Sequence, residues 1–266
     1  MKKHAIAAAI LFGLSGVAQA GVVTIWGETL SGNFSQAEMN TFYNSLPGHT
    51  SSIAGGTLDT VNLASTNLLW ATQPSDDYTG AELTTMANFL AGGGRIAFLG
   101  EHGSFGAAQN IRINAALSAL GSTITINNVI LDSGFRSASV GDGQILNHPL
   151  TTGVNTYEYA AFAPLTISGT AEALMLGEDT YLGNPSVMMA YQNIGPGSIF
   201  LITDQNVWDN ADTGWPGGFN NARMFENLLS GNTGAPPVNP VSEPGALALL
   251  GIGLMGLMAA RRRKSA

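Results

Sequence analysis

Residues 95 to 104, with the sequence RIAFLGEHGS, place a carboxylate and an imidazole directly after a short apolar run. The run predicts a buried strand at 95–99, and Glu101 and His102 are the first ionisable residues of the Gly-rich loop that follows it. A carboxylate beside an imidazole suits general acid–base catalysis. Asp204, after a second apolar run at 199–203, is the third candidate catalytic residue. The open alternative is a loop pair that only hydrogen-bonds backbone amides.

Polar residues also follow the other predicted strands. Parallel strands end at one edge of their sheet, and ligands of open α/β sheets bind beyond that edge. The candidate binding residues there are Glu28, Asp76, Glu101, Asp204, Asn206 and Trp208. Carboxylates that converge in this way need a cation, a shared proton or bound hydroxyl groups to relieve their repulsion. We therefore expect either a solvated acidic rim or an acidic crevice that takes a divalent cation.

Oxygen-rich crevices favour hard ions such as Ca²⁺. The candidate metal ligands are Glu28, Glu101, Asp204 and Asp209. Adding His102 or His148 would admit a transition metal, although His148 in NHPLTTGV is also suited to shaping a turn. Trp208 and Trp215 could form a platform for stacking sugars, or could pin their own loop to the body of the domain.

The elements that must position these residues alternate between strands and helices. Apolar runs predict strands at 22–26, 67–72, 95–99 and 123–126, and a β-hairpin that turns on Gly195-Pro196-Gly197 and ends in a strand at 199–203. Ser/Thr-x-x-Glu capping boxes at Ser35 and Thr79 begin two of the helices. The pattern predicts an α/β fold with three layers, in which helices cover both faces of a mostly parallel sheet. Strands 22–26, 67–72, 95–99 and 199–203 should be parallel neighbours.

Part of this core resembles a known superfamily. The segments GGGRIAFLGEHGSFGAAQNIRINAALSALG, NHPLTTGV, FLITDQNVWDN and NNARMFENLL are similar to degenerate extracellular or membrane-associated branches of the class I glutamine-amidotransferase-like superfamily. The resemblance implies a flavodoxin/amidotransferase-like domain over residues 21–231. Catalytic members carry Cys in the elbow after the strand, where this chain has Leu99-Gly100-Glu101-His102-Gly103 and no Cys anywhere. A carboxylate cannot perform thiol-type amide transfer, so the resemblance implies the fold without the family activity.

The N-terminal segment reads as an export signal. Two lysines, an apolar run and Ala18-Gln19-Ala20 predict a signal peptide and its helix over residues 1–20. Signal peptidase would cleave after Ala20, and the mature chain would start at Gly21. No thiol chemistry is available in that oxidising compartment, because the chain has no cysteine for disulfides, thiolate metal sites or nucleophiles.

The C-terminal segment reads as a sorting signal. A Pro-rich linker over 232–243 leads to a run without charged residues over 245–260, which predicts a short transmembrane helix with its basic tail on the cytoplasmic side. Residues 244–266 resemble the bacterial PEP-CTERM signal, and the residues that carry this resemblance are Glu243, Pro244, Arg261, Arg262 and Arg263. It implies an exosortase as a partner and cleavage near Glu243-Pro244. It also implies a membrane-anchored precursor that has passed the inner membrane and then reaches the cell surface or the medium.

The charge balance limits the kinds of partner that the domain can bind. Over the domain at residues 21–231 the chain has four arginines, no lysine and seventeen acids, a formal charge of −13. This charge repels phosphate backbones and excludes nucleic acid as a partner. We therefore expect an exported surface or matrix protein with a non-catalytic α/β binding domain and an exopolysaccharide as a candidate partner. The alternative is an extracellular hydrolase of carbohydrate or amide bonds that uses Glu101.

Overall fold

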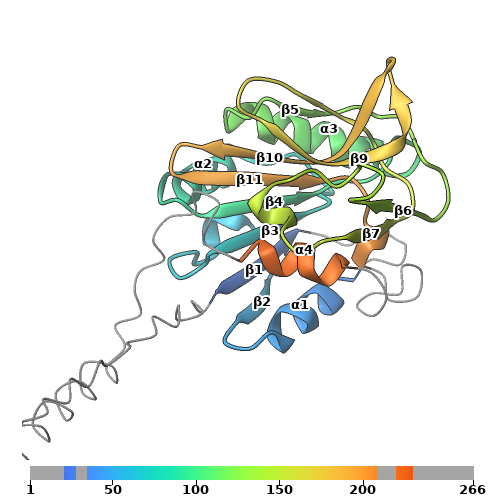
Figure 1. Ribbon diagram of the computed structural model, residues 1–266. Coiled ribbons are helices and arrows are strands. Elements are labelled where there is room, and N and C mark those ends of the chain that lie inside the picture. Colours follow the sequence, from blue (N-terminus) through green and yellow to red (C-terminus); the bar gives the residue numbers. More distant parts are fainter. Residues whose placement is uncertain (1–20, 28–34, 209–219, 230–266) are drawn as a thin grey trace, which may run out of the picture.

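A computed structural model describes residues 21–27, 35–208 and 220–229, and these form an α/β domain around one large sheet (Figure 1). The sheet has nine strands in the order β2-β1-β3-β4-β11-β10-β8-β5, with β9 paired to β10. Its strands are β1 Val22–Gly27, β2 Thr50–Ala54, β3 Leu68–Thr72, β4 Arg95–Leu99, β5 Ile124–Ile126, β8 Leu165–Ile167, β9 Glu172–Tyr181, β10 Asn184–Ile194 and β11 Gly197–Ile202. Strands β6 Arg136–Ser139 and β7 Thr156–Tyr159 form a separate antiparallel pair.

The first five strands of that order are parallel. β1 pairs in parallel with β2 and β3, β3 with β4, and β4 with β11. The four strands that the sequence predicted as parallel neighbours are therefore adjacent, which confirms that expectation. β10, β9, β8 and β5 are antiparallel to their neighbours, so only this part of the sheet is parallel.

Helices cover both faces of the sheet. They are α1 Gln36–Ser45, α2 Gly80–Ala91, α3 Gly103–Ala119 and α4 Asn221–Asn227. Side chains of α1 and α4 pack in one core, and those of α2 and α3 pack in the other. The central strands supply both cores in alternation: Trp70 of β3 faces the first and Leu69 faces the second. This alternation explains why the central strands are apolar at every position.

Of the two capping boxes that the sequence predicts, the structure contains one in full. Thr79 forms the complete capping box with Glu82 at the start of α2, as the sequence predicted. Ser35 does cap α1, but its side chain accepts from the amide of Ala37 and not from that of Glu38.

At the end of β1, Gly27 has a φ of 113°, and a Cβ there would lie 2.1 Å from the carbonyl oxygen of Thr72. Only glycine fits this close approach of two strands.

The ends of the chain lie outside the part that the structure describes. This holds for the predicted signal peptide, the linker, the transmembrane segment and every sorting residue from Glu243 to Arg263. Within residues 21–27, 35–208 and 220–229, no helix combines the length and the hydropathy needed to cross a membrane.

Candidate functional site

Glu101 and Asp204 lie side by side where two neighbouring strands end. Glu101 follows β4 and Asp204 follows β11, and these strands pair in parallel up to Leu99 and Ile202. The amide of Gly100 then bonds the carbonyl of Ile202 at 2.8 Å, which continues the pairing into the two loops. The carboxyl edge of the sheet therefore brings together two acids that are 103 residues apart in the chain, as the sequence predicted.

Both carboxylates are buried and bonded to backbone amides. Glu101 is 1% exposed and accepts from the amides of His102 at 2.7 Å and Gln205 at 3.1 Å. Asp204 is fully buried and accepts from the amides of Ala160 at 2.8 Å and Asn206 at 2.9 Å. The pair thus ties the β4–α3 loop, the β11 exit and the segment after β7 to one another.

The helix that follows Glu101 is built around it. The side-chain amide of Asn110 in α3 bonds both backbone groups of Glu101: its oxygen accepts from the amide at 3.1 Å, and its nitrogen donates to the carbonyl. Gly106 lies directly over the Glu101 side chain, since a Cβ at Gly106 would come within 2.5 Å of the Glu101 Cβ. Gly106 also departs from helical φ/ψ values, which kinks the first turn of α3 at this contact.

Burial changes the acidity of the pair. Burial and the neighbouring Asp204 charge raise the pKa of Glu101, and the two amide bonds offset only part of that rise. Burial also raises the pKa of Asp204, against two amide bonds of its own. The two groups titrate as a pair, because ionisation of either carboxyl group places a charge beside the other and disfavours its ionisation.

The side chain of His102 approaches that of Glu101, although the two residues are adjacent in the chain. His102 is the N-cap residue of α3, and its Nε2 lies 3.5 Å from Oε1 of Glu101. Its Nδ1 lies 2.8 Å from the hydroxyl oxygen of the exposed Ser104. Burial lowers the pKa of His102, which keeps its ring neutral at pH 7. A serine hydroxyl, an imidazole and a carboxylate therefore follow one another in space.

The other predicted binding residues divide between surface and core. Asp76 is exposed in the loop after β3, and its neighbour Asp77 contacts Arg112 at 3.3 Å. The buried side chain at this part of the edge is that of Gln73, which donates to the side chain of Gln205 at 2.9 Å. Both glutamines follow apolar strands directly or within three residues, and this is the signal in the sequence that could have identified them.

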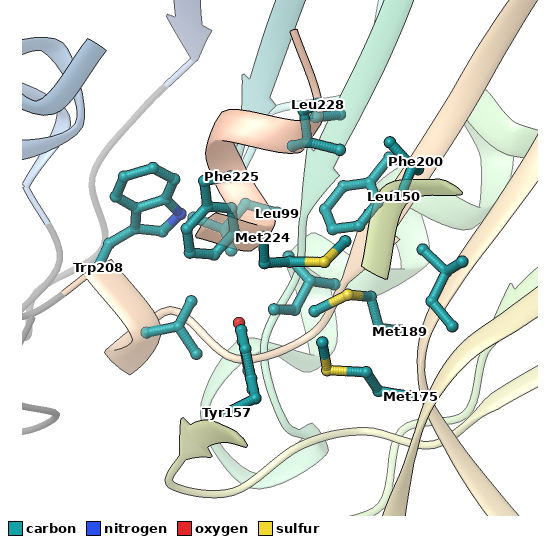
Figure 2. Close-up of a cluster of buried hydrophobic side chains, with 14 of the residues drawn as sticks. Leu99, Leu150, Tyr157, Met175, Met189, Phe200, Trp208, Met224, Phe225 and Leu228 are labelled. Atoms are coloured by element: carbon teal, nitrogen blue, oxygen red, sulfur yellow. The ribbon is translucent and has the colours of Figure 1, made fainter. Parts of the chain in front are cut away.

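Trp208 is buried and serves the core. It ends the short 3₁₀ turn Asn206–Trp208 and stacks on Phe225 of α4 with ring centroids 4.2 Å apart (Figure 2). Its ring is fully covered, which fits the expectation that it pins its loop and leaves no face for a sugar. Tyr157 points into the same cluster, and among the described residues its hydroxyl has no hydrogen-bond partner (Figure 2).

Only some of the proposed metal ligands lie in the part of the chain that the structure describes. Glu28, Asp209 and Trp215 lie outside the described residues. In the parts of the chain that the structure does describe, no three His, Asp or Glu side chains gather closely enough to hold a metal ion. His148 caps the 3₁₀ turn Pro149–Thr151 by accepting from the amide of Leu150 at 3.1 Å. The divalent cation stays a prediction that depends on Glu28 and Asp209.

The fold defines a three-layer α/β domain, and solved structures with this fold exist. The N-terminal domain of mmIFT52 is similar with a TM-score of 0.59 at 15% identity, over 79% of this chain and 98% of that domain. The cytoplasmic protein STM1381 from Salmonella typhimurium LT2 has a TM-score of 0.54 at 12% identity, over 78% of this chain and 98% of that protein. The exo-β-1,4-mannosidase Op5Man5 from Opitutaceae bacterium strain TAV5 has a TM-score of 0.50 at 12% identity, over 81% of this chain and 37% of that enzyme.

Identities this low establish a shared fold and not a shared activity. These three structures are not described as amidotransferases, so they do not support the superfamily resemblance. No curated protein matches the chain in sequence. The particular assignment comes from the tail: residues 240–264 match the PEP-CTERM protein-sorting motif. The chain is thus an exported protein that carries an exosortase sorting signal.

Proposed function

We propose that the mature chain is a cell-surface or matrix protein whose α/β domain binds or supports other components without catalysing a reaction. The observation that carries this proposal is the bonding of Glu101 and Asp204. Each carboxylate accepts two backbone amides and is withdrawn from solvent, at 1% and 0% exposure. Such a pair holds loops in place, whereas a general acid or base must reach the proton that it transfers.

The sorting part of the proposal goes further than the motif itself. Signal peptidase removes residues 1–20, the segment 245–260 holds the precursor in the inner membrane, and the exosortase cleaves near Glu243-Pro244. The chain then reaches the cell surface or the medium. There its acidic domain, with a formal charge of −13, avoids polyanions and has neutral partners such as an uncharged exopolysaccharide.

Processing in the native host tests this route. The intact mass of the exported protein should correspond to a chain that starts at Gly21 and ends near residue 243. Replacing Glu243 and Pro244 with alanine should retain the uncleaved chain in the membrane fraction. Asn232→Ala is the matched control, since it changes the linker outside the 240–264 match and should leave processing intact. A surface protein that keeps both ends would contradict the route.

One observation favours a second candidate function, a hydrolase. The Ser104 hydroxyl, the His102 ring and the Glu101 carboxyl follow one another at 2.8 and 3.5 Å, which is the order of a nucleophile, a base and its supporting acid. Turnover of ester, amide or glycoside substrates by the purified chain, lost in Ser104→Ala and retained in Ser122→Ala, would favour the hydrolase. The same assay without turnover by the wild type favours the non-catalytic domain.

A further inference from the structure

Among the described residues the main path of the large sheet is open at both ends, so the two strands at these ends need protection. β2 ends it on one side and β5 on the other. An outermost strand presents unpaired N–H and C=O groups that can pair with a strand from another molecule. Proteins commonly prevent this with lysine or proline on the edge, but the domain has no lysine, and neither strand contains a charged residue or proline. Some other device must close these edges.

At β2 the device is the side chain of Asn44 in α1. The amide of Thr50 bonds Gly21 on the β1 side, so the backbone groups of the next residue, Ser51, point outward. The Asn44 oxygen accepts from the Ser51 amide at 2.8 Å, and the Asn44 nitrogen donates to the Ser51 carbonyl at 3.1 Å. The side-chain amide therefore occupies the place of a peptide group from a further strand.

At β5 the same arrangement recurs with Asn114 of α3. The amide of Asn127 bonds Pro164 toward β8, so the groups of Ile126 point away from the sheet. The Asn114 oxygen accepts from the Ile126 amide at 2.8 Å, and its nitrogen donates to the Ile126 carbonyl at 2.9 Å. The two ends of one sheet are thus closed by the same residue type in the same geometry, each time from the helix that packs beside the strand.

A third case lies on the small β6–β7 sheet. Asn221 of α4 accepts from the amide of Glu158 at 2.9 Å and donates to its carbonyl at 2.7 Å. Asn221 is 3% exposed, whereas Asn44 is exposed. The same device therefore occurs at an exposed position and at a buried one.

We propose that Asn44 and Asn114 are edge clasps, whose task is to keep β2 and β5 from pairing with the same strands of a second copy of this chain. A second copy is the partner that fits, because Thr50–Ala54 and Ile124–Ile126 carry no charge and so do not repel themselves, although the domain as a whole is acidic. The exposed Ile53 would add apolar contact to such a pair.

Amide hydrogen exchange and light scattering on the mature exported chain test the proposal. Asn44→Ala should speed exchange of the Ser51 amide about tenfold, because it removes the acceptor that this amide has among the described residues. The Ile126 amide, held by Asn114, should not change and serves as an internal reference. The matched control is Thr41→Ala on the same helix, since the Thr41 hydroxyl donates to the carbonyl of Ala37 within α1.

Self-association is the decisive readout. The wild type and Thr41→Ala should stay monomeric, and Asn44→Ala should form dimers whose fraction rises with protein concentration. The double variant Asn44→Ala/Asn114→Ala, open at both edges, should form larger assemblies. Unchanged Ser51 exchange in Asn44→Ala would overturn the proposal, and so would a monomeric Asn44→Ala chain at every concentration. A wild type that already pairs through β2 would overturn it too.

Discussion

Two buried carboxyl sites in this domain do similar structural work with different electrostatics. Glu101 and Asp204 sit together at the carboxyl edge of the sheet, and each accepts two backbone amides. Asp132 is 1% exposed and stands in the loop between β5 and β6. It accepts from the Tyr159 hydroxyl at 2.6 Å and from the amides of Glu178 and Asp179, each at 2.7 Å.

The two sites differ in the groups that surround their carboxyl side chains. The Asp132 carboxylate accepts three hydrogen bonds, from one hydroxyl and two amides, and a left-handed φ of 48° is tolerated to place it there. Glu101 and Asp204 meet each other as well as donors, so one of the two favours the protonated form. The three donors around Asp132 indicate a loop anchor, whereas the raised pKa values of Glu101 and Asp204 are of the kind often found at functional sites.

The largest expected effect is at the solitary anchor. Asp132→Ala should lower the free energy of unfolding by about 3 kcal/mol, because it leaves a buried hydroxyl and two amides without their acceptor. Urea denaturation at pH 7 measures this change. Asp142→Ala is the control on an exposed carboxylate and should stay within about 0.5 kcal/mol. Equal losses in the two variants would remove the distinction between anchor and surface.

The paired site should respond to pH. The folded pKa of Glu101, about 8, is raised above its unfolded value, so the native state binds more protons than the unfolded chain. That stability is fully present below the unfolded pKa and is lost as pH rises through the folded pKa, by up to about 1.4 kcal/mol per pH unit for one proton. Glu101→Gln should flatten the fall between about pH 5 and 8.

The control for this slope is Glu226→Gln, which changes a half-exposed carboxylate on α4. Its unfolding free energy should follow the wild-type pH dependence. Urea midpoints collected across the pH range for the three proteins give the comparison directly. A wild-type curve that rises with pH, or a Glu101→Gln curve parallel to it, would contradict the raised pKa.

The smallest expected effect concerns metal ions. The two described candidate ligands already bond amides, and no third His, Asp or Glu joins them within residues 21–27, 35–208 and 220–229. Millimolar Ca²⁺ or Mg²⁺ should therefore shift the melting temperature equally in the wild type and in Glu101→Gln. A rise in the wild type alone would assign a cation to the paired site, with Glu28 or Asp209 completing it.

The parallel part of the fold was predictable because its strands are buried on both faces. Runs such as IAFL and IFLI are apolar at each position, and the capping box at Thr79 marks the start of α2. β2 was missed because its residues, TSSIA, are exposed or half-exposed at an edge and carry no apolar pattern. The segment TYEYAAFAPLTI supplies β7 and β8 of two different sheets, and no local pattern in it indicates that division.

The candidate site was predictable in part for the same reason. Glu101 and Asp204 each follow an apolar strand, and parallel strands bring such residues to one edge. The partners of that pair could not be read in advance, since Asn110, Ala160 and Gln205 reach it through a helix kink, a loop and a strand exit. Trp208 is a further case: its place in a loop is visible in the chain, but its stacking on Phe225 is not.

The sequence by itself determined the sorting motif and the central sheet. Sorting signals and buried strands are written in consecutive residues, as charge, apolar runs and local caps. Only the tertiary structure decided which groups the polar residues bond. Whether Glu101 catalyses or anchors, and whether Asn44 or Asn114 is a plain surface amide or closes a sheet edge, depends on hydrogen-bond partners that folding brings within 3 Å. Such a bond depends on distance and angle, and the order of residues along the chain fixes neither.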